Sequence, residues 1–283
     1  MSYSAKITQA ACQTLTGGGE GVWGRAGESF FPVPLPLPDH LPNLVLVGTV
    51  HGDPAGYARA WRLLSHFQPG FITVEISPFS VRYRRKHEGR WRRLLWQALA
   101  QLPPSARGHL AIRRLQAQVE MPFELRAARD WGEAYRVPWR PLDLEGPARR
   151  HLPRYETELL NLENLHALSA TEDVSLEDWV AGEYRRARGD WRRAPWRVGP
   201  QEDEARRREA FQARRLRHLT SGGVRILHLG GWEHLAPWRD GSGLTAALAD
   251  LRPLALLLAD ADGLGTTAMD LPEPGLDAAA ISC

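Results

Sequence analysis

The chain has 283 residues, 43% of them hydrophobic, and carries a mild net charge of +3, so it can bury a large core without disulfides or structural metal ions. Its two cysteines, Cys12 and Cys283, lie near opposite ends, which excludes a disulfide framework and a paired-cysteine zinc site. The N-terminal residues lack the pattern of a signal peptide, and the longest apolar run, 253–259, is far shorter than the roughly 18 residues of a membrane span. We therefore predict a soluble, cytoplasmic protein with no membrane span.

The first 42 residues are interpreted as a lead-in to the folded domain. Residues 17–19 are a glycine run that predicts a flexible break, and residues 32–38 alternate proline with apolar residues. Such alternation is typical of an extended, polyproline-like strap. The strap is expected to lie along the domain or to contact a partner.

From residue 44 onward, short apolar runs alternate with amphipathic segments. The expected strands are 44–50, 71–76, 139–144, 224–229 and 254–259, and the expected helices cover 54–67, most of 78–136, and stretches near 154–168, 176–188, 202–219 and 244–251. This alternation predicts an α/β fold in which a mostly parallel central sheet is flanked by helices.

The predicted organisation is one α/β domain over residues 43–262, followed by a tail at 263–283 that has no periodicity. The domain includes a helical insertion at 77–137, which cannot enter the sheet and is expected to form a cap or lid beside the strand ends. An oligomer interface is the alternative. Within the insertion, apolar residues recur at the helical spacing expected of a core or an interface: Trp91, Leu94, Leu95 and Ala98.

Two Gly-x-x-His tetrapeptides follow predicted strands. The first covers residues 48–51 and ends at His51, and the second covers 231–234 and ends at His234. In parallel α/β sheets, ligands bind beyond the carboxyl ends of the strands, so a histidine just past a strand lies where chemistry is expected. Glycine at such a position also allows the backbone to approach a ligand closely.

Two carboxylates obey the same rule, because Glu75 and Asp143 lie near the ends of two other predicted strands. If the four strands are parallel neighbours, these carboxylates meet His51 and His234 at one edge of the sheet. A single histidine or glutamate at a strand end is most often a structural, hydrogen-bonded residue. Four at equivalent positions favour a functional site.

Strand-to-helix turns follow the first two strands. Asp53-Pro54 comes after His51, and Ser77-Pro78 comes after Glu75. Each pair has a good N-cap residue followed by proline, which is favoured at the first helical position. Both pairs therefore predict the start of a helix.

The order and spacing of these motifs resemble the TraB/PrgY family. That family includes the Tiki proteins and is related more distantly to ChaN-like and erythromycin-esterase-like proteins. The resemblance is carried by the segments 46–75, 120–143, 208–214 and 226–235. Each motif is short, and their order is more specific than any one of them.

The resemblance implies that His51, Glu75, Arg208 and His234 occupy the positions of the family's functional residues. Tiki members are regarded as metal-dependent proteases, PrgY-like members as modulators of peptide pheromones, the esterase-like relatives as metal-free hydrolases, and ChaN as a haem binder. This chain departs from the common pattern in the residues after His51 and in the bulky pair inside the second tetrapeptide. These departures leave the substrate and the metal open.

The residue types suit hydrolysis. Two imidazoles and one carboxylate are enough to hold a catalytic divalent ion with an open position for water, so His51, Glu75 and His234 are the predicted ligands of zinc, manganese or cobalt. Arg208 is expected to stabilise developing negative charge, and Asp143 to orient a ligand or act as a base. Without a metal or any other cofactor, one histidine or Glu75 is the general base.

The sequence thus predicts a TraB-like hydrolase that acts on a peptide, amide or ester bond of a peptide or small-molecule substrate. The alternative is a non-catalytic protein that binds a peptide or haem-like ligand in the same pocket, and a homo-oligomer is left open. Nearly all basic residues are arginine, and Trp-Arg pairs recur, a combination able to stack bases or bind anions. Because acidic residues are interspersed, nucleic acid is not expected as a partner.

Overall fold

The computed structural model describes residues 41–170, 174–197 and 202–264. The predicted lead-in with its strap and the predicted tail lie almost wholly outside the described residues. The described part of the predicted domain 43–262 divides into two compact units. One unit contains the sheet, and the other is helical and consists of 77–121 and 144–179. No helix among the described residues is long and apolar enough to span a membrane.

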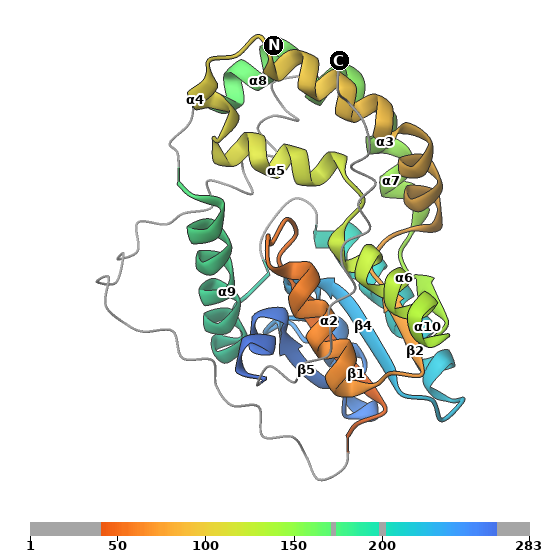
Figure 1. The fold of residues 1–283 in the computed structure, drawn as a ribbon. Helices are drawn as coiled ribbons and strands as arrows, with labels where there is room; N and C mark the ends of the chain where they lie inside the picture. Colours follow the sequence, from red (N-terminus) through yellow and green to blue (C-terminus); the bar gives the residue numbers. More distant parts are fainter. Residues whose placement is uncertain (1–40, 171–173, 198–201, 265–283) are drawn as a thin grey trace. The chain divides into compact units, whose positions relative to one another are not determined.

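The described residues form one five-stranded parallel sheet, in the order β3-β2-β4-β1-β5 (Figure 1). Its strands are β1 (Leu44–Thr49), β2 (Phe71–Val74), β3 (Trp139–Pro141), β4 (Ile226–Gly231) and β5 (Leu254–Leu257). The strands β1 and β4 are apolar almost throughout and lie inside the sheet, as parallel strands covered on both faces require. The predicted α/β class and parallel sheet are confirmed.

The register brings four strand ends together. Thr49 at the end of β1 pairs with Gly231 of β4, and Val74 at the end of β2 lies opposite both Leu229 of β4 and Pro141 of β3. Because the strands are parallel and adjacent, the residues that follow them emerge at one edge of the sheet.

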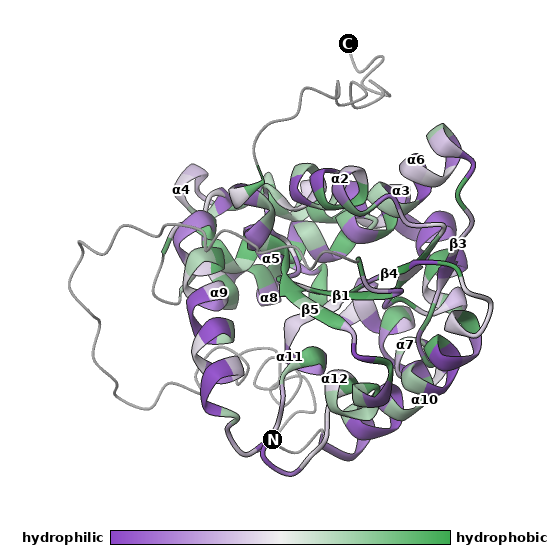
Figure 2. Ribbon diagram, turned by 90° about the horizontal axis from the view of Figure 1, so that it is seen from below, coloured by the Kyte–Doolittle hydropathy of each residue, from purple (hydrophilic) through white to green (hydrophobic). Residues whose placement is uncertain are grey.

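Helices of the sheet unit cover both faces of the sheet (Figure 2). One face carries α2 (Gly56–Phe67) and α6 (Phe123–Tyr135), which meet through an edge-to-face contact between Trp61 and Trp131 with ring centroids 5.1 Å apart. The other face carries α10 (Glu202–Thr220), α11 (Trp232–Leu235) and α12 (Leu244–Ala247). There, Leu216 of α10 packs in one apolar cluster with Leu46 and Ile226.

The C-terminal part of the sheet unit is tied down by ion pairs. After β5, the short helix η4 (Leu258–Gly263) carries Asp262, which accepts hydrogen bonds from Arg59 and Arg62 of α2. The helix α9 (Leu176–Arg193) begins in the helical unit, and its C-terminal part lies in the sheet unit, where Arg188 pairs with Asp260. These pairs hold the chain after the last strand against two helices.

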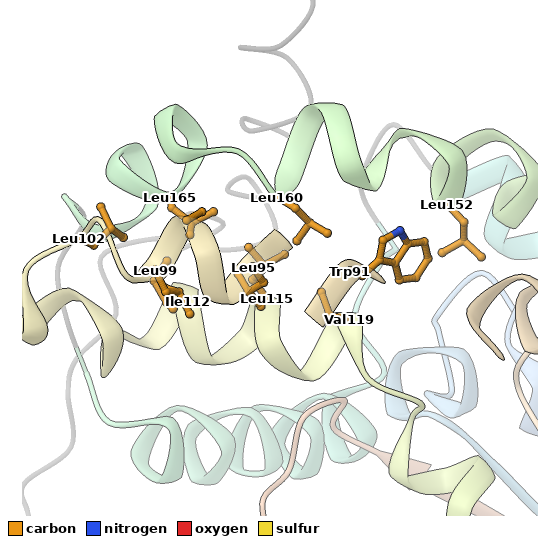
Figure 3. Packing of buried hydrophobic residues seen from close by; sticks show 11 residues of the cluster. Trp91, Leu95, Leu99, Leu102, Ile112, Leu115, Val119, Leu152, Leu160 and Leu165 are labelled. Carbon is orange, nitrogen blue, oxygen red and sulfur yellow. The ribbon is translucent and has the colours of Figure 1, made fainter. Parts of the chain in front are cut away.

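The helical unit has its own core (Figure 3). It comprises α3 (Pro78–Leu99), α4 (Pro104–Arg107), α5 (Leu110–Val119), α7 (Glu145–His151), η1 (Leu152–Arg154), η2 (Tyr155–Leu159) and α8 (Leu162–Ser169). Trp91 and Leu99 of α3 are fully buried against Ile112 of α5 and Leu165 of α8. The predicted apolar stripe of Trp91, Leu94, Leu95 and Ala98 therefore packs in a core, which is one of the two roles expected for it.

Three differences from the predicted elements have local causes. Ser77 caps α3 as predicted, because its Oγ accepts a hydrogen bond from the Ser80 amide, but α2 begins only at Gly56. Asp53 instead accepts from the Ala55 amide and from Arg59.

The helix α6, predicted as part of the insertion 77–137, packs in the sheet unit. The last strand ends at Leu257, where the main chain turns into η4. The cap or lid role of the insertion stays a prediction.

Candidate functional site

Gly48, the first residue of the first tetrapeptide, allows the main chain of α11 to lie close to β1. A Cβ at Gly48 would lie 3.0 Å from Trp232 Cβ and 3.1 Å from Trp232 Cα, on the short helix α11. Real Cβ atoms rarely approach so closely, so a side chain at residue 48 would require α11 to shift by a few tenths of an ångström away from β1. The close approach therefore serves helix packing and brings α11, which carries His234, against the strand that precedes His51.

The second tetrapeptide lies at the centre of the site. A Cβ at Gly231 would have three polar side chains at 3.7 Å: Glu75 through Oε2, His234 through Cδ2 and His51 through Nε2. The amide of Gly231 donates to Glu75 Oε2 at 2.7 Å. The structure thus brings together the three side chains that the sequence proposed as ligands, around one strand end.

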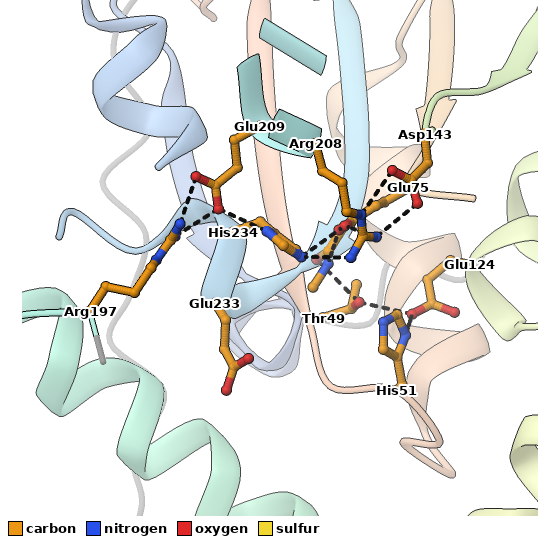
Figure 4. A network of polar contacts seen from close by, with 12 residues as sticks. Thr49, His51, Glu75, Glu124, Asp143, Arg197, Arg208, Glu209, Glu233 and His234 are labelled. Carbon is orange, nitrogen blue, oxygen red and sulfur yellow. Dashed lines mark hydrogen bonds and ion pairs between the residues drawn. The ribbon is translucent and has the colours of Figure 1, made fainter. Parts of the chain in front are cut away.

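Arg208 points into this cluster from α10 (Figure 4). Its NH2 donates to Glu75 Oε1 at 2.7 Å, and its Nε and NH2 donate to the two oxygens of Asp143 at 2.9 and 2.8 Å. The neighbouring Arg206 and the distant Arg217 form ion pairs at the surface instead. The inward position of Arg208 is the one that the family resemblance implies, and Asp143 orients this arginine.

His51 is held by a carboxylate that the sequence did not place in the site. Its Nδ1 lies 2.8 Å from Glu124 Oε1, which also accepts a hydrogen bond from Thr49 Oγ1 at 2.8 Å. The Glu124 side chain is 3% exposed, and its other oxygen has no hydrogen-bond partner among the described residues. The His51 side chain is 68% exposed.

His234 is held in the same way by Glu209. Its Nδ1 lies 2.8 Å from Glu209 Oε1, and Glu209 accepts two hydrogen bonds from Arg197, at 2.6 and 2.9 Å. On the other side of the ring, Nε2 lies 3.1 Å from Glu75 Oε1 and 3.3 Å from Arg208 NH1. It can donate to the carboxylate when the ring is protonated and accept from the guanidinium when it is neutral.

Glu124 and Glu209 share a signal that the sequence contains. Glu124 falls on the buried face of α6 with Ala127, Ala128 and Trp131, and Glu209 falls on the buried face of α10 with Gln212, Ala213 and Leu216. An acidic residue at the apolar spacing of an amphipathic helix requires a buried partner. Both glutamates find that partner in a histidine.

The charges of the cluster set its protonation. Burial raises the pKa of Glu75, but electrostatic attraction to His234, Arg208, His51 and His228 in their protonated forms outweighs it and lowers the pKa to about 2. The pKa of Arg208 is raised, because Glu75 and Asp143 outweigh the cost of burial. Glu75 is therefore a carboxylate, and Arg208 a cation, at any pH near neutral.

The two other histidines on these strands differ in protonation. Partial desolvation of the His51 ring, whose side chain is still 68% exposed, tends to lower its pKa, but the charge of Glu124 and its hydrogen bond raise it by more. His228 in β4 is fully buried, and burial lowers its pKa to about 4. It is therefore neutral, and its Nδ1 lies 2.9 Å from Thr73 Oγ1 within the sheet. His228 packs within the strand, as the sequence suggested.

The donor types of the cluster suit a divalent metal ion, but in this structure the same donor atoms contact Arg208 and the Gly231 amide. Both oxygens of Glu75 accept hydrogen bonds, and the guanidinium of Arg208 faces both Glu75 Oε1 and His234 Nε2. A permanent cation at this place repels a second one. In the described part of the chain, no group of three or more His, Cys, Asp or Glu side chains is arranged to hold a metal ion.

Fold and site define a class of protein: a parallel α/β domain with an arginine, carboxylates and two histidines beyond the carboxyl ends of four adjacent strands. Comparison of the chain with protein-family models, with curated proteins and with solved structures found no match.

Proposed function

We propose that this protein is a hydrolase that cleaves a peptide, amide or ester bond at the cluster of His51, Glu75, Arg208 and His234. The contacts of His51 support the proposal most strongly. Its imidazole is exposed to solvent, its Nε2 lies beside the cluster, and its Nδ1 is held by the buried carboxylate of Glu124. A histidine oriented in this way is a suitable general base for water.

In this proposal, Nε2 of His51 removes a proton from the attacking water. Glu124 fixes the tautomer with the proton on Nδ1 and stabilises the imidazolium that forms. A base works best when its pKa is near the working pH, and the raised pKa of His51 moves it in that direction from the reference value of 6.5. A carboxylate with a pKa of about 2 is a weak base, so Glu75 does not take this role.

Arg208 is the proposed stabiliser of negative charge on the substrate oxygen. Asp143 and Glu75 hold its Nε and NH2, while NH1 lies on the side of His234. A positioned guanidinium needs little reorganisation during the reaction. His234, which is oriented by Glu209, is the candidate proton donor to the leaving group.

The metal-dependent form of the proposal uses His51, Glu75 and His234 as ligands of zinc, manganese or cobalt. It requires Arg208 to release Glu75 and His234, whereas the metal-free form uses the observed contacts unchanged. A bound ion supplies an acidic water and polarises the scissile carbonyl. The resemblance to the TraB family supports the hydrolase class and leaves the choice between the two forms open.

The test is turnover of ester, amide and peptide substrates by protein purified without chelator, together with its metal content. We expect wild-type turnover that His51→Ala lowers by at least roughly 10²-fold. The control His218→Ala, which changes an exposed histidine on α10, should leave turnover unchanged. Turnover that survives chelation supports the metal-free form, and turnover restored only by zinc, manganese or cobalt supports the metal form. A stoichiometric peptide or haem-like ligand without turnover would show that the protein is a binder and not a hydrolase.

A further inference from the structure

One face of α3 concentrates positive charge, independently of the proposed active site. The helix buries Trp91, Leu95 and Leu99 in the core of the helical unit. Its opposite side exposes four basic side chains and a tryptophan, here named the basic face: Arg85, Lys86, Arg92, Arg93 and Trp96. Their spacing of three, four and seven residues places them on one side of the helix.

The charges of the basic face are not neutralised within the unit. Arg82 and Arg90 on the same helix pair with Glu145 and Glu156. Arg85, Lys86, Arg92 and Arg93 form no ion pair with any described residue. The helix contributes one acidic residue, Glu88, whose carboxylate accepts a hydrogen bond from the Met121 amide.

Some arginines elsewhere on the surface are neutralised, since Arg149 and Arg217 are exposed and each pairs with a carboxylate. Others, such as Arg214 and Arg215 of α10, are exposed without an ion pair to a described residue. What distinguishes the basic face is that four such charges lie on one side of one helix beside the exposed Trp96. The sequence composition argued against nucleic acid because acidic residues are interspersed, and the structure adds that no described carboxylate pairs with these four side chains.

The chemistry of the face favours a phosphate backbone with accessible bases. A guanidinium binds phosphate with two parallel hydrogen bonds and also stacks on flat rings. Trp96 is 59% exposed and lies one helical turn beyond Arg92 and Arg93, where a base can stack on it. A duplex has no free base at such a position.

A membrane surface fits less well. Helices that lie in the lipid interface insert a broad apolar face. The apolar side of α3 is buried in the core of the helical unit, and Trp96 is the one large hydrophobic residue of the basic face. We propose that the basic face of α3 binds single-stranded nucleic acid, with Arg85, Lys86, Arg92 and Arg93 on phosphates and Trp96 stacked on a base.

The test is fluorescence anisotropy of labelled single-stranded U12 and dT12 with the full chain at 50 and 200 mM salt. Four phosphate contacts predict a log–log salt slope of about −2.8, a loss of roughly 50-fold in affinity between the two salt concentrations. The variant with Arg85→Gln, Lys86→Gln, Arg92→Gln and Arg93→Gln should lose most of the affinity and of the salt dependence. Trp96→Ala should weaken binding roughly 5- to 150-fold, the range for one stacked base, and Trp96→Phe should restore much of the loss.

The matched control removes the same charge from paired arginines: Arg113→Gln, Arg149→Gln, Arg206→Gln and Arg217→Gln. It should bind as the wild type does, and circular dichroism should show that both quadruple variants are folded. Equal affinity of the two quadruple variants would overturn the proposal. So would tight binding to phosphatidylserine vesicles without binding to either oligonucleotide, or preference for a duplex together with no effect of Trp96→Ala.

Discussion

His51 and His234 follow two adjacent strands, and each has a buried glutamate 2.8 Å from Nδ1, yet they face different surroundings. The His51 side chain is 68% exposed, and one oxygen of its glutamate has no hydrogen-bond partner among the described residues. The His234 side chain is 16% exposed and lies within a continuous series of charged contacts from Arg197 to Asp143. The same pair of groups thus suits a general base in contact with solvent at one strand end and a proton donor held in a fixed position at the other.

The largest effect should come from removing each of the two imidazoles in turn. His51→Ala should lower kcat/KM by roughly 10²- to 10⁴-fold, the usual contribution of a general base. It should also cost stability, because it leaves the buried carboxylate of Glu124 without its imidazole partner. His234→Ala should lower both activity and stability, although Glu209 keeps its two hydrogen bonds from Arg197. Initial-rate kinetics and urea denaturation of both variants measure this, and unchanged stability of His51→Ala would contradict the contact with Glu124.

Variants of Arg208 test the charged contacts around His234 while leaving both histidines in place. Arg208→Met removes the partner of two buried carboxylates, Glu75 and Asp143, and should destabilise the protein by roughly 3 kcal/mol. Arg206→Met, two residues away, removes exposed ion pairs and should cost less than about 1 kcal/mol. Urea denaturation of the two variants compares them directly. Arg208→Lys should fold better than Arg208→Met but should stay impaired in turnover, because an ammonium lacks the guanidinium fork.

Glu75 links stability to pH. Its pKa is lowered from 4.5 to about 2 in the folded state, so it stabilises the protein fully above the unfolded pKa. This contribution should be lost as the pH falls from about 5 to about 2. The difference in urea midpoint between the wild type and Glu75→Gln should therefore shrink across that window. A constant difference would mean that the carboxylate is not held by the charges around it.

The smallest effect concerns the pH profile of turnover. The raised pKa of His51 depends on Glu124, so the unprotonated base should be lost at a higher pH in the wild type than in Glu124→Gln. The acid limb of kcat/KM should move to lower pH in that variant, toward the reference value of about 6.5. Glu209→Gln should leave the position of this limb nearly unchanged, because its histidine is not the proposed base. A shift in Glu209→Gln alone would assign the base to His234.

Much of the fold could be predicted from local patterns. The apolar runs at β1 and β4 identify buried parallel strands, and the Ser77-Pro78 pair marks the start of α3. Asp53-Pro54 has the same pattern but is used differently, because Asp53 also binds Tyr184 and Arg59. Tyr184 is distant in sequence, so no local pattern predicts the later start of α2.

The strand-end residues of the site could be predicted. For the two helical glutamates, the sequence indicates burial but not the partner that each one meets. The carboxyl-end rule places His51, Glu75, Asp143 and His234 at one edge once the strands are parallel neighbours. Arg208 came from the family resemblance, since nothing local separates it from the surface arginines around it. Glu124 and Glu209 are set by the rotation of α6 and α10 against the sheet. That rotation depends on packing across the whole unit.

The close contact at Gly48 has a mechanical consequence. Because a Cβ at residue 48 would meet Trp232 at 3.0 Å, the clearance between β1 and α11 is less than the width of one methyl group. The strand carries one imidazole at its end and the helix carries the other. The distance between the two histidines is therefore set by the contact between the main chains of β1 and α11. Main chain adjusts less readily than side chains do. A larger residue at position 48 would move α11 away from β1 and so change the distance between the two histidines, without replacing either of them.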